Sequence, residues 1–378
     1  MERFDAIVVG AGPAGSTAAF CLSRAGARVL LLDRQRFPRD KPCGGGLTYR
    51  AVRQLPVPVD AVVEDVVDRV ELGFRYGRRF ERRSDGPLIL MTQRRRLDAY
   101  LAEQAAGAGA DLRDGVRATA LELENGGAIV RFDGTAASAS VVIGADGANG
   151  LTARSLGLLE TRRHGVAFEG NVPYGEDAAR FRGRALLDLG TVPGGYAWAF
   201  PKGDHVNVGV GGWETEGPRL REHLERACKG YGLPQERLQE LRGYRLPLRG
   251  AGERPVRGHA LAVGDAAGLV DPFSGDGIYE ALLSARLAAE AGLDVLAGRA
   301  ANLEPYADRL ARELEPLTSA GWGAKIAFDR YPRLTYALTR TPPAWRLAER
   351  MLRGELSSPR AARGVLRLPV KVLKALAA

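Results

Sequence analysis

Short apolar runs bounded by glycine mark the beginning of the chain. Ala6–Val9 is one such run, and Arg28–Asp33 is another that ends in an acidic residue. Strands that are apolar on both faces belong in parallel sheets covered by helices. Between the two runs, Ala14–Ala25 is small and apolar enough for a closely packed helix, which Gly26 ends. The pattern therefore predicts a compact βαβ unit at the start of the chain.

Two kinds of sheet are indicated further along. The first sheet is expected to contain strands over 116–123 and 128–132 and buried strands over 139–146 and 259–265, with helices over 94–106 and 278–296. The region 165–250 contains segments typical of antiparallel strands, at 185–189, 196–200 and 206–210, with a turn at 201–204. The end of the chain is predicted to be helical, broken at Pro332, Pro342–Pro343, Pro359 and Pro369.

These elements predict an α/β fold made of segments that are discontinuous in sequence. A Rossmann-type nucleotide-binding domain is expected from residues 1–50, 94–160 and 251–300. An antiparallel-sheet domain for substrate, inserted into the first, is expected from residues 51–93 and 161–250. Residues 301–378 are expected to form a basic helical region.

The charge is concentrated at one end of the chain. Residues 309–378 hold 14 Lys and Arg and 5 Asp and Glu, whereas the preceding 308 residues hold 40 of each. This distribution argues against nucleic-acid binding and indicates a basic end that faces something anionic. The three cysteines cannot form a disulfide framework or an all-cysteine four-ligand metal site, so a reducing cytoplasm fits. No apolar run is long enough to predict a transmembrane helix.

A glycine motif lies between the first predicted strand and helix. Gly10 permits a tight turn, Gly12 lets the backbone approach a pyrophosphate, and Gly15 lets the helix pack closely on the strand. The exposed N–H groups at the start of the helix favour phosphate. Asp33, 18 residues after Gly15, is placed to accept hydrogen bonds from a ribose diol. The arrangement predicts a dinucleotide site.

Two later segments favour a flavin over a nicotinamide. Residues 143–147 and 263–268 each place an aspartate after a buried strand, and the second of these is Asp265. The chain then passes Gly275 and Gly277 and begins a long helix at Ile278, whose positive end suits an anionic reduced flavin.

Together with other motifs, these segments resemble a known family. The motifs are Pro42-Cys43-Gly44-Gly45-Gly46-Leu47, Arg94-x-x-Leu97-Asp98, and Tyr196-x-Trp198-x-Phe200-Pro201-Lys202-Gly203. Over about residues 4–300 the sequence is similar to the geranylgeranyl reductase family of FAD-dependent oxidoreductases, which has the para-hydroxybenzoate hydroxylase-like flavoprotein fold. Leu97 departs from the family, which often has Phe there.

The resemblance implies a tightly bound FAD. The residues that it implies as FAD contacts are Ala14, Asp33, Arg34, Cys43, Gly44, Arg94, Ala118, Asp265, Gly277 and Ile278. Arg94 suits a pyrophosphate because its guanidinium is a fork-shaped cation. A second dinucleotide fingerprint is not found, so the electron donor is expected to be NADPH bound transiently or a reduced ferredoxin-like protein.

Aromatic residues alternate in the third motif. Tyr196, Trp198 and Phe200 share one face of a strand because alternate side chains point the same way. They form either an ordinary sheet core or, as the resemblance implies, the wall of an isoprenoid site. Cys43 either orients the substrate and helps to donate a proton or is only a small residue in a tight loop. The four histidines lack metal-ligand spacing, so no metal is expected.

The resemblance therefore implies a reductase of isoprenoid carbon–carbon double bonds, acting on a lipid, quinone or pigment precursor. The alternatives are a flavin monooxygenase or halogenase of the same fold, and a non-catalytic prenyl-lipid binding protein. The basic end, with Arg363, Arg367 and Lys371 among Leu and Val residues, fits either an anionic membrane surface or a helix packed on the protein. If the basic end binds a membrane, we expect a cytoplasmic protein held peripherally at the inner face of that membrane.

Overall fold

An eight-stranded sheet is built around β1 (Glu2–Val9). The structure is a computed structural model that describes residues 1–158, 163–175, 179–250 and 252–378. In it, β1 pairs in parallel with β2 (Val29–Asp33) and β11 (Thr135–Gly144). Further strands are β8 (Asp111–Asp114), β18 (Ala260–Ala262), β17 (Val256–Arg257), β10 (Gly127–Phe132) and β9 (Ala118–Glu124). The central strands are buried on both faces, as predicted.

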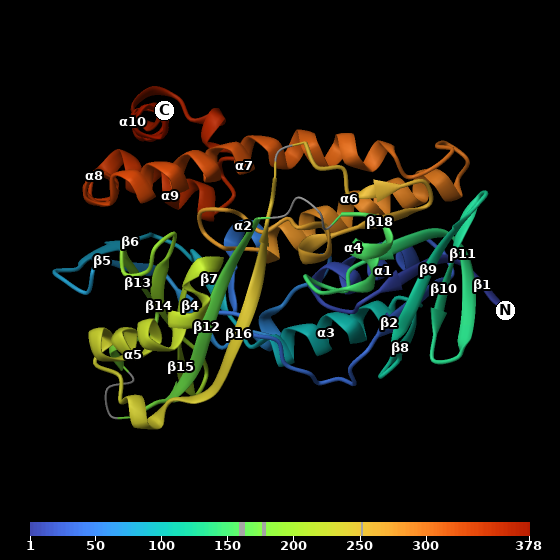
Figure 1. The fold of residues 1–378 in the computed structure, drawn as a ribbon, viewed down its shortest axis with the longest axis horizontal. Helices are drawn as coiled ribbons and strands as arrows, with labels where there is room; N and C mark the ends of the chain where they lie inside the picture. The colour runs from blue at the N-terminus through green and yellow to red at the C-terminus, as the bar shows by residue number, and fades with distance from the viewer. Residues whose placement is uncertain (159–162, 176–178, 251) are drawn as a thin grey trace.

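Three helices pack side by side against this sheet. The middle one is α1 (Pro13–Arg24), which contacts both α3 (Arg94–Gly107) and α6 (Ile278–Leu296) (Figure 1). Small residues such as Ala18 and Ala19 are fully buried, so α1 lies close to the strands. The predicted βαβ unit and the predicted long helix are confirmed.

A second sheet has seven strands, and its pairing is mostly antiparallel. Its order is β16 (Gln239–Leu248), β12 (Arg163–Pro173), β15 (His205–Trp213), β14 (Tyr196–Pro201), β13 (Arg184–Leu189), β5 (Arg69–Phe74) and β6 (Phe80–Arg83). All neighbours are antiparallel except β13 and β5. Helix α5 (Leu220–Tyr231) covers one face, where Ala197, Ala199 and Cys228 are buried. The opposite face is left for the site.

Shorter elements join the two large sheets. A three-stranded sheet consists of β3 (Gly46–Thr48), β7 (Ile89–Met91) and β4 (Asp65–Val67). Two short helices are α2 (Tyr49–Val52) and α4 (Leu151–Ser155). The strand β3 continues directly from the glycines that follow Cys43, so this small sheet fixes one end of that loop.

The C-terminal region is helical and lies along one side of the molecule. Helix α7 (Pro305–Arg330) is followed by α8 (Pro332–Thr339), α9 (Pro342–Leu352) and α10 (Arg367–Ala377), which gather above β5, β6 and β13 (Figure 1). Pro332 and Pro342 each begin a helix, so these predicted breaks are confirmed. The predicted break at Pro369 is wrong: this residue lies in the first turn of α10, where its missing N–H costs no intrahelical hydrogen bond. Among the described residues, no helix has the length and apolarity needed to cross a bilayer.

Candidate functional site

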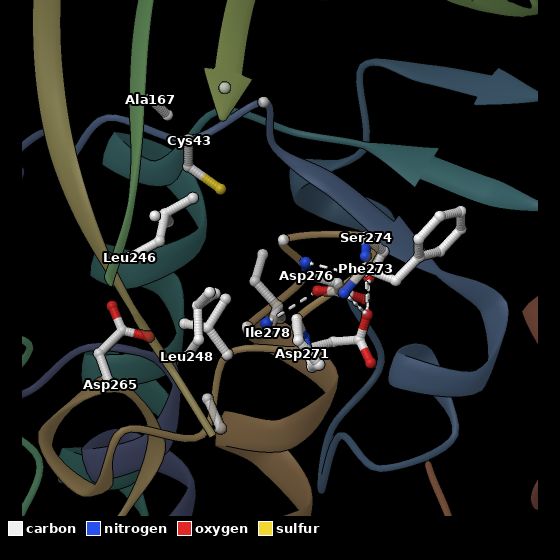
Figure 2. Close-up of a pocket in the computed structure, with 18 of the residues that line it drawn as sticks. Cys43, Ala167, Leu246, Leu248, Asp265, Asp271, Phe273, Ser274, Asp276 and Ile278 are labelled. Atoms are coloured by element: carbon white, nitrogen blue, oxygen red, sulfur yellow. Dashed lines mark hydrogen bonds between the residues drawn. The ribbon is translucent and has the colours of Figure 1, made fainter. Parts of the chain in front are cut away.

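A cavity of about 1140 Å³ extends from the first sheet to the C-terminal helices. One end is formed where β1, β2, β11 and β18 finish, the edge at which ligands bind in open parallel sheets. The middle is walled by the open face of the second sheet, and the far end by α9 and α10. Figure 2 shows Cys43 pointing into the middle of this space, across from Ile278.

The glycines at the first end have separate structural reasons. Gly10 has φ +101°, and a Cβ there would lie 2.4 Å from the Ala145 carbonyl oxygen. A Cβ on Gly15 would lie 1.7 Å from the Gly10 carbonyl oxygen, so helix and loop are in direct contact. A Cβ on Gly12 would instead enter cavity space, with Arg39 and Arg94 at 3.6 and 3.8 Å. The backbone of Gly12 thus borders a space that two guanidinium groups face, which fits a pyrophosphate.

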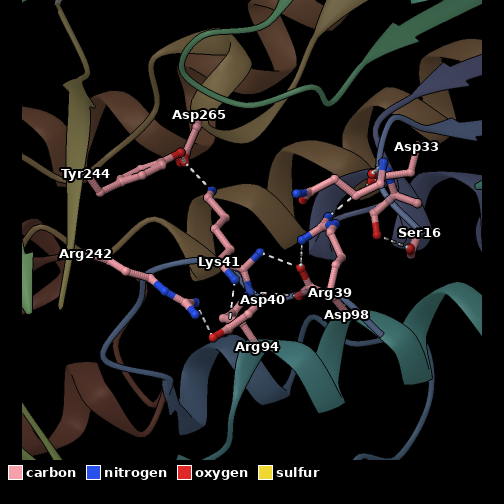
Figure 3. Close-up of polar contacts among 12 residues, drawn as sticks. Ser16, Asp33, Arg39, Asp40, Lys41, Arg94, Asp98, Arg242, Tyr244 and Asp265 are labelled. Atoms are coloured by element: carbon pink, nitrogen blue, oxygen red, sulfur yellow. Dashed lines mark hydrogen bonds and ion pairs between the residues drawn. The ribbon is translucent and has the colours of Figure 1, made fainter. Parts of the chain in front are cut away.

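Those two guanidinium groups belong to a buried ionic network (Figure 3). Arg94 donates to Asp98 from Nε at 2.7 Å and from Nη2 at 2.8 Å, and Arg39 donates to the same carboxylate at 2.7 Å. Arg39 also donates to Asp33 at 3.2 Å, and the Ala11 N–H donates to that carboxylate at 2.8 Å. Although burial lowers it, the pKa of Arg94 is raised overall because of Asp98. The cations are therefore fixed in place before any ligand arrives.

Asp265 lies farther along the cavity, on the turn that precedes α6. Its carboxylate accepts hydrogen bonds from Lys41 Nζ at 2.8 Å and from the Tyr244 hydroxyl at 2.7 Å. Burial opposes ionisation, but Lys41 and the hydrogen bonds prevail, and the pKa of Asp265 is lowered. Sequence reasoning missed Lys41 and Tyr244, as it missed Arg39, because loop cations and a tyrosine on a partly exposed strand carry no distinctive spacing.

The N-terminus of α6 is shaped by a polar loop at the opposite wall. The Ile278 N–H donates to Asp276 Oδ1 at 2.9 Å, and Ser274 donates to Asp271 from its N–H and its hydroxyl at 2.7 and 2.8 Å (Figure 2). Gly277 lies just before the helix, and a Cβ there would meet Asp265 at 3.2 Å. The loop holds the start of α6 against the cavity.

The aromatic residues of β14 form one continuous wall. Ring centroids of Tyr196 and Trp198 are 6.0 Å apart, and those of Trp198 and Phe200 are 6.2 Å apart. Trp198 donates from Nε1 to Asn207 at 2.8 Å, which fixes the indole. A Cβ on Gly44 would lie 2.9 Å from the Phe200 ring, so the glycine loop packs directly on this wall.

The structure adds two buried charged residues behind Cys43. Glu169 of β12 accepts a hydrogen bond from the Cys43 N–H at 2.7 Å, and burial raises its pKa to about 6. Lys202, only 2% exposed, donates to the carbonyl oxygens of Gly44 and Thr92, and burial lowers its pKa to about 8. Lys202 belongs to the third motif, but a lysine in a predicted turn is normally solvated, so its burial was not expected.

The predicted site residues come together in this cavity. Those that line it are Gly10, Gly12, Ala14, Asp33, Arg34, Cys43, Gly44, Arg94, Ala118, Tyr196, Trp198, Phe200, Asp265, Gly275, Gly277 and Ile278. Gly15 alone of the predicted set lies outside the lining, where it packs α1 on the loop after β1. Arg34 is exposed at the rim, near the start of β9, where Ala118 lies.

Comparison with known proteins identifies the fold and the family. Residues 3–182 match the model of the FAD binding domain. The chain is 32% identical to digeranylgeranylglycerophospholipid reductase 1 of Methanopyrus kandleri, over 82% of this chain and 87% of that protein. It is 32% identical to geranylgeranyl diphosphate reductase of Rhodobacter capsulatus, over 80% and 78%. The chain belongs to the geranylgeranyl reductase family.

Other members and neighbours of this family show its breadth. Menaquinone reductase of Mycolicibacterium smegmatis is 34% identical over 76% of both chains. A geranylgeranyl bacteriochlorophyll reductase-like protein of Thermoplasma acidophilum has a solved structure that superposes with a TM-score of 0.81 at 23% identity, covering all of both chains. The flavin-dependent brominase Bmp2 superposes with a TM-score of 0.77 at 18% identity, so halogenases share the fold. This geranylgeranyl reductase family member is an FAD-dependent oxidoreductase, and the donors around its first cavity end fit that cofactor.

Proposed function

We propose that this protein reduces carbon–carbon double bonds in the isoprenoid chain of a lipid, quinone or pigment precursor. The observation that supports this most is the continuity of the cavity, which joins the nucleotide end to an apolar wall and to α10. An isolated alkene offers no polar group to bind, so it must be oriented by apolar surface. Bound FAD, once reduced, supplies a hydride equivalent.

The chain's own residues have distinct tasks in this proposal. Arg39 and Arg94 would hold the pyrophosphate, Asp33 the ribose, and Asp265 with Lys41 the polar chain that leads to the flavin ring. The glycines after Cys43 and the start of α6 would hold the ring. Tyr196, Trp198 and Phe200 form the substrate wall and exclude water, which keeps the reduced cofactor from side reactions.

The far end of the cavity suggests how a lipid reaches it. Helix α10 lines the cavity with Val370 and Leu373, while Leu368 and Val372 on the same helix are 55% and 41% exposed. Basic residues accompany the exposed apolar ones, at Arg363, Arg367, Lys371 and Lys374. Such a surface suits an anionic membrane. The protein accordingly associates with the cytoplasmic face of a membrane and draws its substrate from it.

The electron donor in this proposal is NADPH bound transiently or a reduced ferredoxin-like protein. This part of the proposal rests on the sequence, in which a second dinucleotide motif is not found.

The decisive experiment uses the FAD-loaded protein reduced chemically under anaerobic conditions. Addition of geranylgeranyl diphosphate or a digeranylgeranyl lipid should reoxidise the flavin, and mass spectrometry should show one H₂ added per reduced bond. Cells with and without the chain should differ in the same masses. Absence of any reoxidation by these substrates, with substrate-dependent oxygen consumption instead, would replace the proposal with a monooxygenase or halogenase. Purification without any flavin would favour a non-catalytic lipid-binding role.

A further inference from the structure

A second, polar hollow lies behind the Cys43 loop. Its volume is about 30 Å³, enough for a water molecule. Lys202, His205, Asn171, Asn207 and Glu240 line only this hollow and not the large cavity.

The hollow and the large cavity share part of their wall. Cys43 and Glu169 line both spaces, together with Asp40, Lys41, Arg94 and Arg242. One layer of residues thus separates the large, mainly apolar space from the small polar one.

Most charged groups around this partition already have close partners of opposite charge. These pairs are Asp40 with Arg242, Lys41 with Asp265, Arg94 with Asp98, Glu64 with Arg96, and His205 with Asp204. Glu240 accepts a hydrogen bond from Asn171. Within the described part of the chain, neither Glu169 nor Lys202 has a partner within ion-pair distance. Lys202 donates only to backbone carbonyls, and Glu169 accepts from the Cys43 backbone.

Reduction of a double bond requires a proton as well as a hydride. One alkene carbon takes the hydride, the other takes H⁺, and the cofactor is left oxidised. In the proposed function the apolar wall keeps bulk water away from the alkene. A titratable group on the partition can take a proton from the polar hollow and release it into the large cavity.

We propose that Glu169, with Lys202 behind it, relays this proton from the polar hollow to the large cavity, a role that rests on the proposed function. Glu169 gives one proton to the alkene carbon for each bond reduced. Lys202 and Glu169 line the same hollow, so a water there takes a proton from Lys202 and gives one to Glu169, and Lys202 then regains its proton from solvent. The pair thus ends each cycle as it began. Lys202 also positions the loop, because it binds the Gly44 carbonyl oxygen.

The acid–base properties of the pair agree with this geometry. Burial raises the pKa of Glu169 to about 6 and lowers that of Lys202 to about 8. The pKa values of both groups thus lie close to neutral pH, where a proton relay works best.

The first test measures reoxidation of the chemically reduced, FAD-loaded protein by geranylgeranyl diphosphate between about pH 5.5 and 8.5. Glu169→Gln and Lys202→Met should slow reoxidation at least about tenfold and flatten its pH profile. Asp188→Asn is the matched control, because Asp188 of β13 is a buried carboxyl whose pKa is also raised by burial and which lines neither space. If the wild type is reoxidised and both variants keep its rate and pH profile, the relay is overturned and the proposed function stands. A wild type that no isoprenoid reoxidises would overturn both.

A second test does not depend on turnover. Infrared spectra of the oxidised, substrate-free protein should show the band of a buried protonated carboxyl that is lost as the pH rises through about 6, and Glu169→Gln should lack that band. Lys202→Met should move the loss of the band to higher pH, because the ammonium group favours the carboxylate. Lys202→Arg, which keeps the charge, should leave the band as in the wild type. A band that is unchanged in Glu169→Gln, or that Lys202→Met does not move, would overturn the relay.

Discussion

At the scale of single residues, the three glycines of the first motif are not equivalent. Gly10 and Gly15 are required by the fold, since a Cβ on either would strike backbone atoms. Gly12 is required only for binding of a ligand in the cavity, since a Cβ there would lie no closer than 3.6 Å to the nearest protein atom. A substitution can therefore separate folding from cofactor binding.

Gly12→Ala should fold with a free energy of unfolding within about 0.5 kcal/mol of wild type but bind FAD at least about tenfold more weakly. Gly15→Ala should lose several kcal/mol, roughly 2 or more, or fail to fold, because of the contact with Gly10. Urea denaturation of the flavin-free proteins and titration with FAD measure the two effects. An unchanged FAD affinity in Gly12→Ala would contradict the assignment of this loop to the pyrophosphate.

Glu169 also predicts a pH dependence of stability. Its pKa in the folded protein is about 6, above the ordinary value of 4.5, because burial disfavours the charged form. The folded state therefore holds this proton more tightly. The resulting stabilisation is complete below about pH 4.5 and is lost as the pH rises through about 6, a change of roughly 2 kcal/mol. Glu169→Gln does not titrate, so its stability relative to wild type should rise by this amount between about pH 4 and 7. If the free energies of unfolding of the wild type and of Glu169→Gln changed equally with pH across that range, the prediction would be contradicted.

At the scale of elements, apolar pattern and turn residues located the strands of the first sheet other than β8 and β17, and the three helices packed on it. Buried runs such as Ala6–Val9 can be recognised because few structures other than strands of a covered parallel sheet require a short segment that is apolar on both faces. Pro369 shows the limit, because a proline ends a helix only when it lies beyond the first turn. The same pattern cannot say which side of a helix faces a cavity, which the structure decides for α10.

The two-sided character of α10 carries its own prediction. Replacing exposed Leu368 and Val372 with serine should reduce binding to vesicles that contain phosphatidylglycerol, because both lose apolar area that would enter the interface. Leu123→Ser, at a similarly exposed position on β9, is the matched control. Vesicle sedimentation measures the difference. If the double variant sediments like the control, α10 packs on the protein without serving as a membrane surface.

At the scale of the whole molecule, the site depends on strand register that no local pattern contains. Glu169 pairs with Gly209 on β15, and Gly209 pairs in turn with Trp198 on β14. A Cβ on Gly209 would lie 2.1 Å from the Trp198 ring, so this glycine gives the indole its room. The sequence identified the residues of the motifs, but Glu169 and Lys202 acquire their meaning only when β12, β14 and the Cys43 loop meet.

In the proposed arrangement FAD lies between the first sheet and the Cys43 loop, so its removal should destabilise the molecule as a whole. At a free FAD concentration about 100 times its Kd, the free energy of unfolding should exceed that of the flavin-free protein by about 2.7 kcal/mol. Chemical denaturation at several FAD concentrations measures this dependence. An unfolding midpoint that is independent of FAD would contradict a site built from folded parts.

Gly45 shows how closely two positions that are distant in the sequence pack against one another. Its φ is +68°, and a Cβ would come within 2.0 Å of both Lys202 Nζ and the Thr92 carbonyl oxygen. Those two atoms are the donor and acceptor of one hydrogen bond, 2.7 Å apart. Asparagine tolerates such a backbone, but its Cβ would still collide with the Thr92 carbonyl oxygen, whatever residue stands at 202. In a library randomised at positions 45 and 202, glycine alone should therefore survive at 45, and the absence of one methyl group is what lets two segments distant in the sequence meet.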